Sequence, residues 1–544
     1  MAVIRYSGFK GRLPGVKNRA LPVKNAIVAT DTVLWRGALE GMQTPALDHT
    51  TFTTGATDTV FARSASKWFE WGTFRDVVRS PIPNDAHGRT YYADGINEIK
   101  VTDLTLEGTT PTSGNPLPQA ELSLGVPAPT VAPSLSAPIG APPTDPASLP
   151  DFEFYVYTFV NSYGEEGPPS PPSAQITLYR PDQSVNVTVG TFPAGAYDMA
   201  SINLYRSNTG DSGSAFQLVT NGIGSGGMFP DTVASASLGA VIESTHWDPP
   251  PTGAKNLIAT PAGFLAASLN NELLFSEIGQ PHAWPATNRL SVPDSDEIVA
   301  LASAGNSIVV MTDTRLYFAT GTSPEAMLLS IPQMPQACVS RKGVVDTPQF
   351  VIYPSPDGLI AVSESSVDIL TRDMFDRDAW QAINPSTIVA GQWNGGYLMF
   401  YTVSSVQYGM FIDIARKEVI DVTPPGTDVR QVYYDKFTDK TYILHSTNQL
   451  SIWDSGAALT YTYQPADTEF LKPETMSRLQ VLADGFPVTI TMASDGVTRW
   501  TKVVNSEAPV RVPWAPPAKK YSVTISSNNV VHEVLLGSTT KEMQ

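Results

Sequence analysis

The sequence predicts an all-β fold: a β-propeller with an inserted fibronectin type III-like β-sandwich and a small C-terminal β-domain. Three observations support this prediction. Charged residues make up only 16% of the chain, below the roughly 25% usual in globular proteins, whereas Gly (40) and Pro (46) are frequent. Short apolar runs alternate with polar residues, and turn-forming residues separate these runs, as in β-strands. Helical periodicity extends over no window of about 15 residues, so we expect little helix.

Length, charge and cysteine content limit the organisation and function of the chain. Its 544 residues exceed one ordinary hydrophobic core, so we expect three or four structural units. A net charge of −17 argues against a sequence-specific nucleic-acid binder, which needs a basic face. Cys338 is the only cysteine, which excludes an intramolecular disulfide framework and a cysteine-based zinc site.

Residues 1–24 are basic and rich in Gly and Pro, which predicts an N-terminal arm. They lack the apolar core of a signal peptide, and the chain has no apolar run of about 18 residues. We therefore expect a soluble protein without membrane insertion. The arm is either a loose terminus or a segment that docks on an acidic face of a neighbouring subunit or ring. Its basic residues are Arg5, Lys10, Arg12, Lys17, Arg19 and Lys24.

Two segments of different composition follow the arm. Residues 25–107 alternate short apolar runs with Thr, Gly and Asp, which predicts a β segment that contributes strands to the propeller. In residues 108–150, Pro recurs every few positions and charge nearly vanishes. Because Pro fixes φ and lacks an N–H donor, we expect this segment to be an extended linker that runs over a surface.

The rest of the chain is a succession of predicted hairpins. Residues 151–250 hold about seven short strands, which is typical of a β-sandwich of the fibronectin type III kind. Residues 251–458 show hairpins at a period of roughly 40–50 residues, which indicates propeller blades. A stacked array of β-sandwiches is the competing architecture. Residues 459–544 carry two more hairpins, either as a small β-domain or as strands that close the propeller.

Two short motifs resemble known catalytic or binding sequences. Residues 222–227 match GxGxxG, but Pro230 follows and no helix is expected, so we predict a sandwich loop instead of a dinucleotide site. Residues 494–500 nearly match the S-x-D-x-G-x-T-W turn of propeller sialidases, with Ser and Asp adjacent rather than spaced. We expect a hairpin turn there. Paired carboxylates could still hydrolyse glycosides, so a propeller glycosidase is the alternative.

Acidic turns are the candidate metal ligands. Two clusters could collect around Ca²⁺ through oxygen atoms, but both lack the Gly and the distal Glu of an EF-hand. We therefore expect solvated turns and predict no metal. The clusters are Asp373, Asp376 and Asp378, and Asp294, Asp296 and Glu297.

Histidine and tryptophan residues are scattered along the chain. The histidines form no H-x-x-x-H pair and no G-x-S-x-G elbow occurs, so we predict no zinc site, no catalytic residue and no cofactor. Tryptophans within strand patterns are expected in the core, with sugar binding as the alternative. The residues are His49, His87, His246, His282, His445 and His532, and Trp68, Trp71, Trp284, Trp393, Trp453 and Trp500.

Several segments resemble, in chain order, the tail nozzle proteins (tail tubular protein B family) of short-tailed bacteriophages. Residues 20–45 are similar to the opening strand pair of that family. A Trp-rich strand, KWFEW, precedes residues 78–92, which resemble its V-R-x-P-I-x-x-D-x-x-x-R-x-Y-Y stretch. Residues 155–172 resemble its inserted sandwich, and residues 273–285 and 353–362 resemble its blade segments.

The resemblance implies a non-enzymatic virion protein. It implies a homohexameric ring below the portal and adaptor rings, with the propellers side by side around the distal channel through which double-stranded DNA leaves. Such a protein is assembled in the cytoplasm of the bacterial host and contacts tail fibres or tip and needle proteins. The DNA would be a transient, non-specific partner.

The acidic charge suggests how such a channel would work. Six copies would carry about −100 in total, and DNA carries one negative charge per roughly 1.7 Å of its axis. We therefore predict an acidic bore with few Lys or Arg, which repels phosphates and lets the duplex slide. The alternatives are a propeller-type glycosidase or depolymerase, a carbohydrate-binding tail protein, or a bacterial surface or secreted carbohydrate-binding protein.

Overall fold

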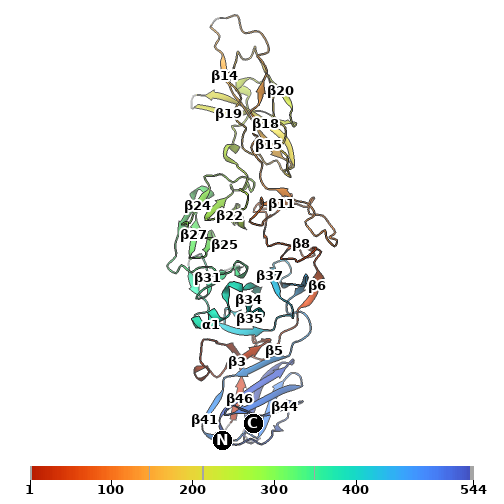
Figure 1. Ribbon diagram of the computed structural model, residues 1–544, viewed down its shortest axis with the longest axis vertical. Helices are drawn as coiled ribbons and strands as arrows, with labels where there is room; N and C mark the ends of the chain where they lie inside the picture. The colour runs from red at the N-terminus through yellow and green to blue at the C-terminus, as the bar shows by residue number, and fades with distance from the viewer. Residues whose placement is uncertain (1–2, 146, 211–212, 348–349, 365, 540–544) are drawn as a thin grey trace.

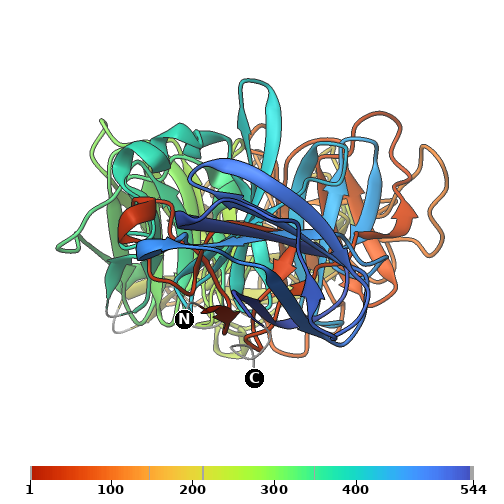
Figure 2. The same cartoon turned by 90° about the horizontal axis from the view of Figure 1, so that it is seen from below.

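Three β units are stacked along the long axis of the protein (Figure 1). The computed structural model describes residues 3–145, 147–210, 213–347, 350–364 and 366–539. An inserted β-domain lies at one end, a β-propeller in the middle, and a C-terminal β-sandwich at the other end, where both chain termini lie. Seen along the long axis, the propeller extends beyond the sandwich on both sides (Figure 2).

Six four-stranded units and one hairpin form the propeller. Contacts join successive units mainly through their first strands. In chain order, the strands are β6 (Ala46–Thr50), β7 (Thr59–Ser64) with β8 (Lys67–Trp71), β9 (Asp76–Arg79) to β12 (Leu122–Ser123) through β10 (Thr90–Ala93) and β11 (Lys100–Thr102), β21 (Lys255–Ala259), β22 (Leu265–Leu269), β23 (Glu272–Phe275) and β24 (Arg289–Ser291). They continue with β25 (Ile298–Ala304), β26 (Ser307–Thr312), β27 (Leu316–Thr320), β28 (Leu328–Ser330), β29 (Val345–Asp346), β30 (Val351–Ser355), β31 (Gly358–Val362), β32 (Val367–Ile369), β33 (Val389–Trp393), β34 (Gly396–Val403), β35 (Val406–Asp413), β36 (Glu418–Val422), β37 (Val429–Asp435), β38 (Lys440–His445) and β39 (Gln449–Ile452).

An N-terminal strand closes the propeller. β6 pairs antiparallel with β39 as the fourth strand of the last blade. The β7–β8 hairpin lies between that blade and the β9–β12 blade, since Trp68 contacts Tyr442 and Trp71 contacts Tyr92. Strand pairing therefore joins early and late parts of the chain, and the C-terminal residues are left to form a separate unit.

Tight turns and apolar faces explain why these segments form blades. Between β33 and β34, Asn394 and Gly395 both have positive φ (45° and 72°), the backbone of a two-residue hairpin. Apolar side chains then fill the space between neighbouring blades. Val309 and Met311 of one blade, for example, belong to the same buried cluster as Val351 and Ile360 of the next.

The inserted domain consists of three small sheets around one core. Tyr157, Phe159 and Leu204 lie in that core. The strands are β13 (Ser134–Leu135), β14 (Asp151–Glu153), β15 (Tyr155–Asn161), β16 (Ile176–Leu178), β17 (Val185–Thr188), β18 (Met199–Gly210), β19 (Gly213–Ile223) and β20 (Met228–Asp231). The sheet orders are β13-β17-β20, β14-β16 and β15-β18-β19.

The Pro-rich segment 108–150 is not only a linker. Its short proline-free stretches keep their N–H donors and form two strands. β12 belongs to a propeller blade, and β13 pairs with β17 in the inserted domain. The segment thus contributes one strand to each of the two units that it connects.

The C-terminal sandwich incorporates the N-terminal segment. Its sheets are β1-β47-β42-β45 and β2-β3-β40-β46-β43-β44, with β41 also paired to β46 and with β36 joining the second sheet to the propeller. The strands are β1 (Val3–Ser7), β2 (Lys10–Arg12), β3 (Asn25–Thr30), β40 (Tyr461–Pro465), β41 (Thr468–Glu474), β42 (Arg478–Ala483), β43 (Val488–Ser494), β44 (Val497–Val504), β45 (Val510–Arg511), β46 (Ala518–Ser527) and β47 (Val531–Gly537).

The prediction that residues 1–24 form a separate arm is wrong for the strands β1 and β2. Ile4 pairs with Leu536 and Tyr6 with Val534, and both side chains are only 3% exposed. Their alternation with Arg5 places the apolar residues inward and the charge outward, which is the pattern of a half-buried strand. The strand could not be recognised from the sequence because it is short and the segment around it is basic.

The remaining elements are short. No helix of the described residues is long and apolar enough to cross a membrane. The elements are β4 (Thr32–Val33), β5 (Glu40–Gly41), α1 (Arg377–Ala382), η1 (Asn18–Ala20), η2 (Ser235–Ser237), η3 (Ser244–His246), η4 (Pro324–Ala326), η5 (Arg341–Gly343) and η6 (Pro385–Thr387).

Candidate functional site: the polar network of the inserted domain and its junction with the propeller

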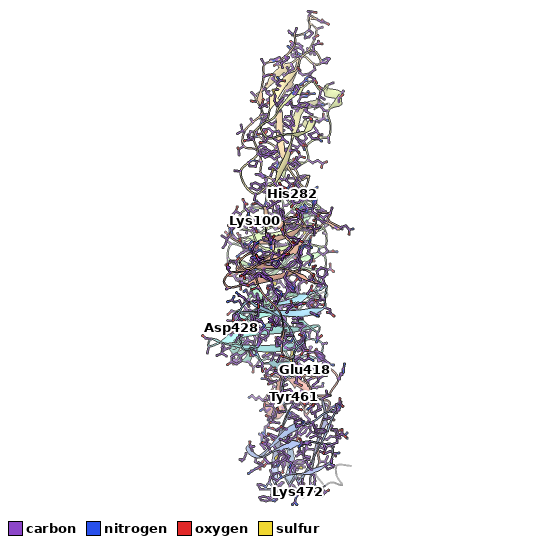
Figure 3. All side chains as sticks on the ribbon, turned by 90° about the vertical axis from the view of Figure 1, so that its right-hand side faces the viewer. Lys100, His282, Glu418, Asp428, Tyr461 and Lys472 are labelled. Atoms are coloured by element: carbon purple, nitrogen blue, oxygen red, sulfur yellow. The ribbon has the colours of Figure 1, made fainter. Side chains whose placement is uncertain are left out.

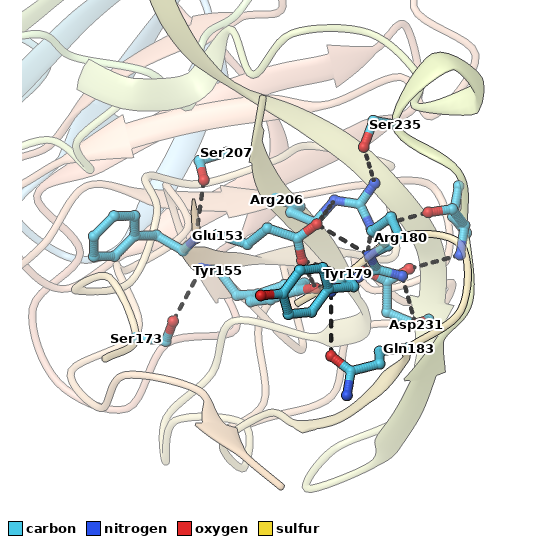
Figure 4. A network of polar contacts seen from close by, with 12 residues as sticks. Glu153, Tyr155, Ser173, Tyr179, Arg180, Gln183, Arg206, Ser207, Asp231 and Ser235 are labelled. Carbon is cyan, nitrogen blue, oxygen red and sulfur yellow. Dashed lines mark hydrogen bonds and ion pairs between the residues drawn. The ribbon is translucent and has the colours of Figure 1, made fainter. Parts of the chain in front are cut away.

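Five polar side chains meet inside the inserted domain (Figure 4). Glu153 and Tyr155 lie two positions apart on consecutive strands, β14 and β15, so their side chains point to the same side. Arg206 on β18 is the strand partner of Tyr155, and Asp231 ends β20. Arg180 follows β16. Four strands and one loop therefore contribute one side chain each.

Short contacts hold these side chains together. Asp231 accepts hydrogen bonds from Arg206 at 2.6 Å and from Arg180 at 2.8 Å. Arg180 also donates to Glu153 at 2.9 Å. The Tyr155 hydroxyl lies 2.7 Å from Asp231 and 2.8 Å from Glu153, and it donates to one of these carboxylates at a time.

The network is charge-balanced and closed to solvent. Arg206 and Asp231 are both 0% exposed, and two guanidinium groups face two carboxylates. Burial, and then the charges of Asp231 and Glu153, raise the pKa of Tyr155 well above its usual value, so the hydroxyl stays protonated. Since each charge is paired within the network, the network offers no free nucleophile or proton donor, and its role is structural.

A second ionic cluster joins the inserted domain to the propeller. Arg89, from the loop before β10, contacts Asp85 at 2.8 Å and Glu165 of the inserted domain at 2.5 Å. His282 of the propeller is fully buried and its Nε2 lies 3.1 Å from the carbonyl oxygen of Glu166. Figure 3 places His282 at the boundary between the two units.

The junction also perturbs the Glu165 carboxyl. Burial alone would raise its pKa, but the neighbouring His282 ring, and then the charge of Arg89, lower the pKa below its ordinary value. The His282 Nδ1 lies 3.6 Å from the Glu165 carboxylate. The carboxylate therefore remains ionised and holds the two units together.

A cavity of about 510 Å³ lies beside this junction. Burial raises the pKa of Asp94, but backbone and side-chain hydrogen bonds from Asn97 outweigh it and lower that pKa. A hydrogen bond from Ser123 lowers the pKa of Glu98, which also accepts one from Tyr197 of the inserted domain. The lowered pKa values keep Asp94 and Glu98 ionised at neutral pH. The lining is Arg75, Asp94, Asn97, Glu98, Lys100, Glu121 and Thr252.

The two candidate motifs lie in turns of different units. Residues 222–227 connect β19 to β20, and no helix follows them. Gly222 and Gly226 have positive φ (76° and 67°), which a tight turn requires. Residues 494–500 form the β43–β44 hairpin of the C-terminal sandwich, with Asp495 and Gly496 at positive φ. Neither motif faces the cavity or the network.

Two residues of the first acidic turn have local partners, and the third, Asp378, is exposed in the first turn of α1. Asp376 caps α1 by accepting a hydrogen bond from the Ala379 N–H, and Asp373 pairs with Lys417. Within the described ranges, no group of three His, Cys, Asp or Glu residues could hold a metal ion.

The second acidic turn lies at the base of a blade. Asp296 is buried and accepts a hydrogen bond from Tyr317. Asp294 accepts one from Asn271, and Glu297 pairs with Lys255 at 2.9 Å. These three side chains thus contact three different partners.

The histidines occupy separate places. His282 lies at the junction, His445 contacts Thr427 and Ser451, and His532 pairs with Asp484. His49 contacts Asp48 and Glu70, and His87 lies against the ring of Tyr163, while His246 ends η3.

All six tryptophans of the strand patterns are buried, with exposures of 2–9%. They belong to the hydrophobic clusters of the blades and of the sandwich: Trp68, Trp71, Trp284, Trp393, Trp453 and Trp500. Buried rings cannot form a sugar-binding platform, so these residues serve as core.

Sequence reasoning did not identify the polar network or the junction. The available signal was a charged residue within an otherwise apolar strand, as with Arg206 in INLYRSN and Glu153 in DFEFYVY. Such residues are almost never fully buried unless they are paired. The direct contacts join residues up to 76 positions apart, as between Tyr155 and Asp231, and only the fold reveals them.

Comparison with models of protein families and with curated proteins gives no match. Solved structures with a similar arrangement include an exported protein of Bacteroides fragilis, with 8% identity and a TM-score of 0.25, covering 44% of this chain and 76% of its own. The WD40 domain of Neurospora crassa Pan2 has 8% identity and a TM-score of 0.23, covering 50% and 82%. BamB of Moraxella catarrhalis has 9% identity and a TM-score of 0.25, covering 70% and 98%.

Proposed function

We propose that this chain is a non-enzymatic structural component of a short-tailed phage virion, the tail nozzle that conducts double-stranded DNA during ejection. One observation carries the proposal: the elongated all-β body is held together, between and within its units, by buried polar contacts such as Arg89–Glu165 and Arg206–Asp231, in which opposite charges are paired. Rigid packing of this kind, with its buried charges paired, is what a conduit needs. The ordered resemblance of its segments to tail nozzle proteins points the same way.

The proposal includes the assembly and its partners. Six copies form a ring below the adaptor and portal rings, and tail fibres or tip and needle proteins attach to it. The inserted domain is a β-sandwich of the fibronectin type III kind, consistent with its small antiparallel sheets around a single core. The location is the virion tail, assembled in the bacterial cytoplasm.

The acidic charge provides the transport mechanism. A net acidic bore neutralises few DNA phosphates and therefore releases few counterions. It binds the duplex weakly, so the duplex can slide. An electrostatic map of the assembled ring is expected to show an acidic lining with few Lys or Arg. A continuous basic lining would contradict this mechanism.

Mass measurement of the purified protein, alone and with its tail partners, tests the proposed function. A sixfold ring that joins a tail complex is the expected result. A monomer that degrades polysaccharide would instead favour the propeller-type glycosidase or depolymerase, and a monomer that only binds polysaccharide would favour a carbohydrate-binding tail protein.

A further inference from the structure

The two ends of the molecule differ in charge. The first 24 residues carry six basic and no acidic residues, and residues 459–544 carry eight of each. Strands from both segments form the C-terminal sandwich, at the opposite end from the inserted domain. Because the whole chain carries −17, residues 25–458 carry −23. The sandwich is thus the basic end, with a net charge of +6, of a strongly acidic protein.

Several exposed cations lie at this end, and Lys10 acts electrostatically on Glu418 of the propeller. Lys10, Lys17, Arg19 and Lys24 are exposed and form no ion pair with any residue that the structure describes. Arg19 also lies close enough to Lys520 for the two positive charges to repel each other. Unpaired like charges on one surface favour an anionic partner, which would relieve their mutual repulsion.

A small pocket lies next to these cations. Its volume is about 160 Å³, and Arg5 and Lys24 flank it. Tyr6 and Phe9 form an apolar, buried floor, and Val23, which is 64% exposed, stands at the rim. Small-molecule sites usually need about 300–1,000 Å³, whereas one anchoring side chain at a protein interface fits a space of this size.

We propose that this basic face docks an acidic protein surface that inserts one apolar side chain into the pocket. The carboxylates around that side chain would pair with Lys24 and the neighbouring cations. The proposal rests on the proposed function in one respect. In a ring of side-by-side copies, basic ends lie next to basic ends, so the acidic bodies of neighbouring copies cannot neutralise them. The occupant is therefore a different protein, the ring to which the nozzle attaches.

The surface favours a protein over DNA or lipid. Eight acidic residues are interspersed among the cations of residues 459–544, and Glu533 already pairs with Arg5. A phosphate backbone is bound by a continuous basic stripe, which such a mixture interrupts. An acidic protein face can instead match alternating charges and fill the apolar pocket at the same time.

Fluorescence anisotropy with the full-length protein tests the proposal. The probe is a fluorescein-labelled peptide, Asp-Glu-Phe-Glu-Asp, compared with Asp-Glu-Ser-Glu-Asp, which lacks the apolar anchor. We expect the Phe peptide to bind more tightly than the Ser peptide and to weaken as salt increases. Lys24→Glu and Val23→Asp should each lower its affinity about tenfold.

A matched control separates the pocket from a general charge effect. Lys440 of the propeller is also exposed and without an ion pair among the described residues, so Lys440→Glu makes the same change of charge elsewhere. It should change peptide affinity by less than about twofold. Equal losses in both variants, or no binding of the Phe peptide, would overturn the proposal. So would a DNA duplex or phosphatidylglycerol vesicles that bind at least as tightly and lose affinity on Lys24→Glu.

The docking site and the proposed function can fail independently. If the wild-type protein forms no sixfold ring but binds the peptide through Lys24, the nozzle proposal fails and the pocket remains. If the ring forms but the peptide does not bind, the docking proposal fails alone. A Lys24→Glu ring of normal mass that no longer binds the peptide supports both.

Discussion

The two β units at the ends of the molecule have opposite kinds of core. The inserted domain buries a charged network of Arg180, Arg206, Glu153 and Asp231 beside its apolar residues. The C-terminal sandwich has a core of apolar and aromatic side chains, including Ile490, Tyr463 and Val523. Both units consist mainly of antiparallel strands, so the strand arrangement alone does not require either kind of core.

The difference follows from the strands that each core must hold. In the sandwich, β46 spans ten residues and alternates buried with partly exposed positions, so apolar burial alone fixes its register. In the inserted domain, β14 has three residues and β20 four, too few for an extensive apolar face. Charged pairs give little net stability after desolvation, but they can fix which short strands lie together. The short strands β14 and β20 of the inserted domain thus depend on specific charged pairs. The sandwich strand β46 depends on buried apolar area.

Removal of β1 tests the area-based core and has the largest expected effect. Deleting residues 1–7 removes Ile4 and Tyr6, and burial of each such side chain contributes about 1.5–3 kcal/mol. The sandwich should lose about 3–6 kcal/mol. Hydrogen exchange in β47 and β42 measures this loss. Arg5→Ala, which removes only a surface ion pair with Glu533, should leave protection in these strands nearly unchanged. Unchanged protection after the deletion would mean that the segment is a loose terminus.

Asp231→Asn tests the pair-based core. The amide keeps the shape of the side chain but removes the carboxylate 2.6 Å from Arg206, which is fully buried and keeps only a longer contact with Glu153 at 3.5 Å. A broken buried ion pair costs about 3–5 kcal/mol, so the inserted domain should unfold locally while the propeller stays intact. Limited proteolysis followed by mass spectrometry detects this. Asp182→Asn is the control, because Asp182 is exposed in the same domain. Equal cleavage of both variants would show that the network is dispensable.

The same distinction explains what the sequence could predict. Alternating apolar residues identified the all-β class and the propeller, because a blade needs only that local pattern and a turn such as Asn394–Gly395. Closure by β6 was not predicted, since β6 pairs with β39 some 400 residues away and its own pattern, ALDHT, is mostly exposed. The network was missed for a related reason. Each of its charged residues is ordinary alone, and only long-range pairing makes it compatible with burial.

Tyr155→Phe sharpens the comparison within the network. The substitution keeps the ring in the core and removes only the hydroxyl that lies between Glu153 and Asp231. Loss of one buried hydrogen bond to a charged group should cost about 1.5–3 kcal/mol, measured by denaturant unfolding or hydrogen exchange in β15. Tyr463→Phe is the matched change in the sandwich, where the hydroxyl contacts only carbonyl oxygens and a backbone N–H, and a smaller loss is expected. A larger loss at Tyr463 would reverse the contrast between the two cores.

Acidification should act on the junction with the smallest effect. The folded-state pKa of Glu165 lies below its ordinary value of 4.5, so its contribution is full above that value and is lost as pH falls through the folded pKa. Protonation weakens the contact with Arg89 and lets the inserted domain move relative to the propeller. Small-angle scattering between neutral pH and about pH 3 should show this change. Glu165→Gln should show it already at neutral pH and respond less to acid. A wild-type scattering profile that stays constant over this range would mean that other contacts, such as the buried His282 ring, fix the orientation.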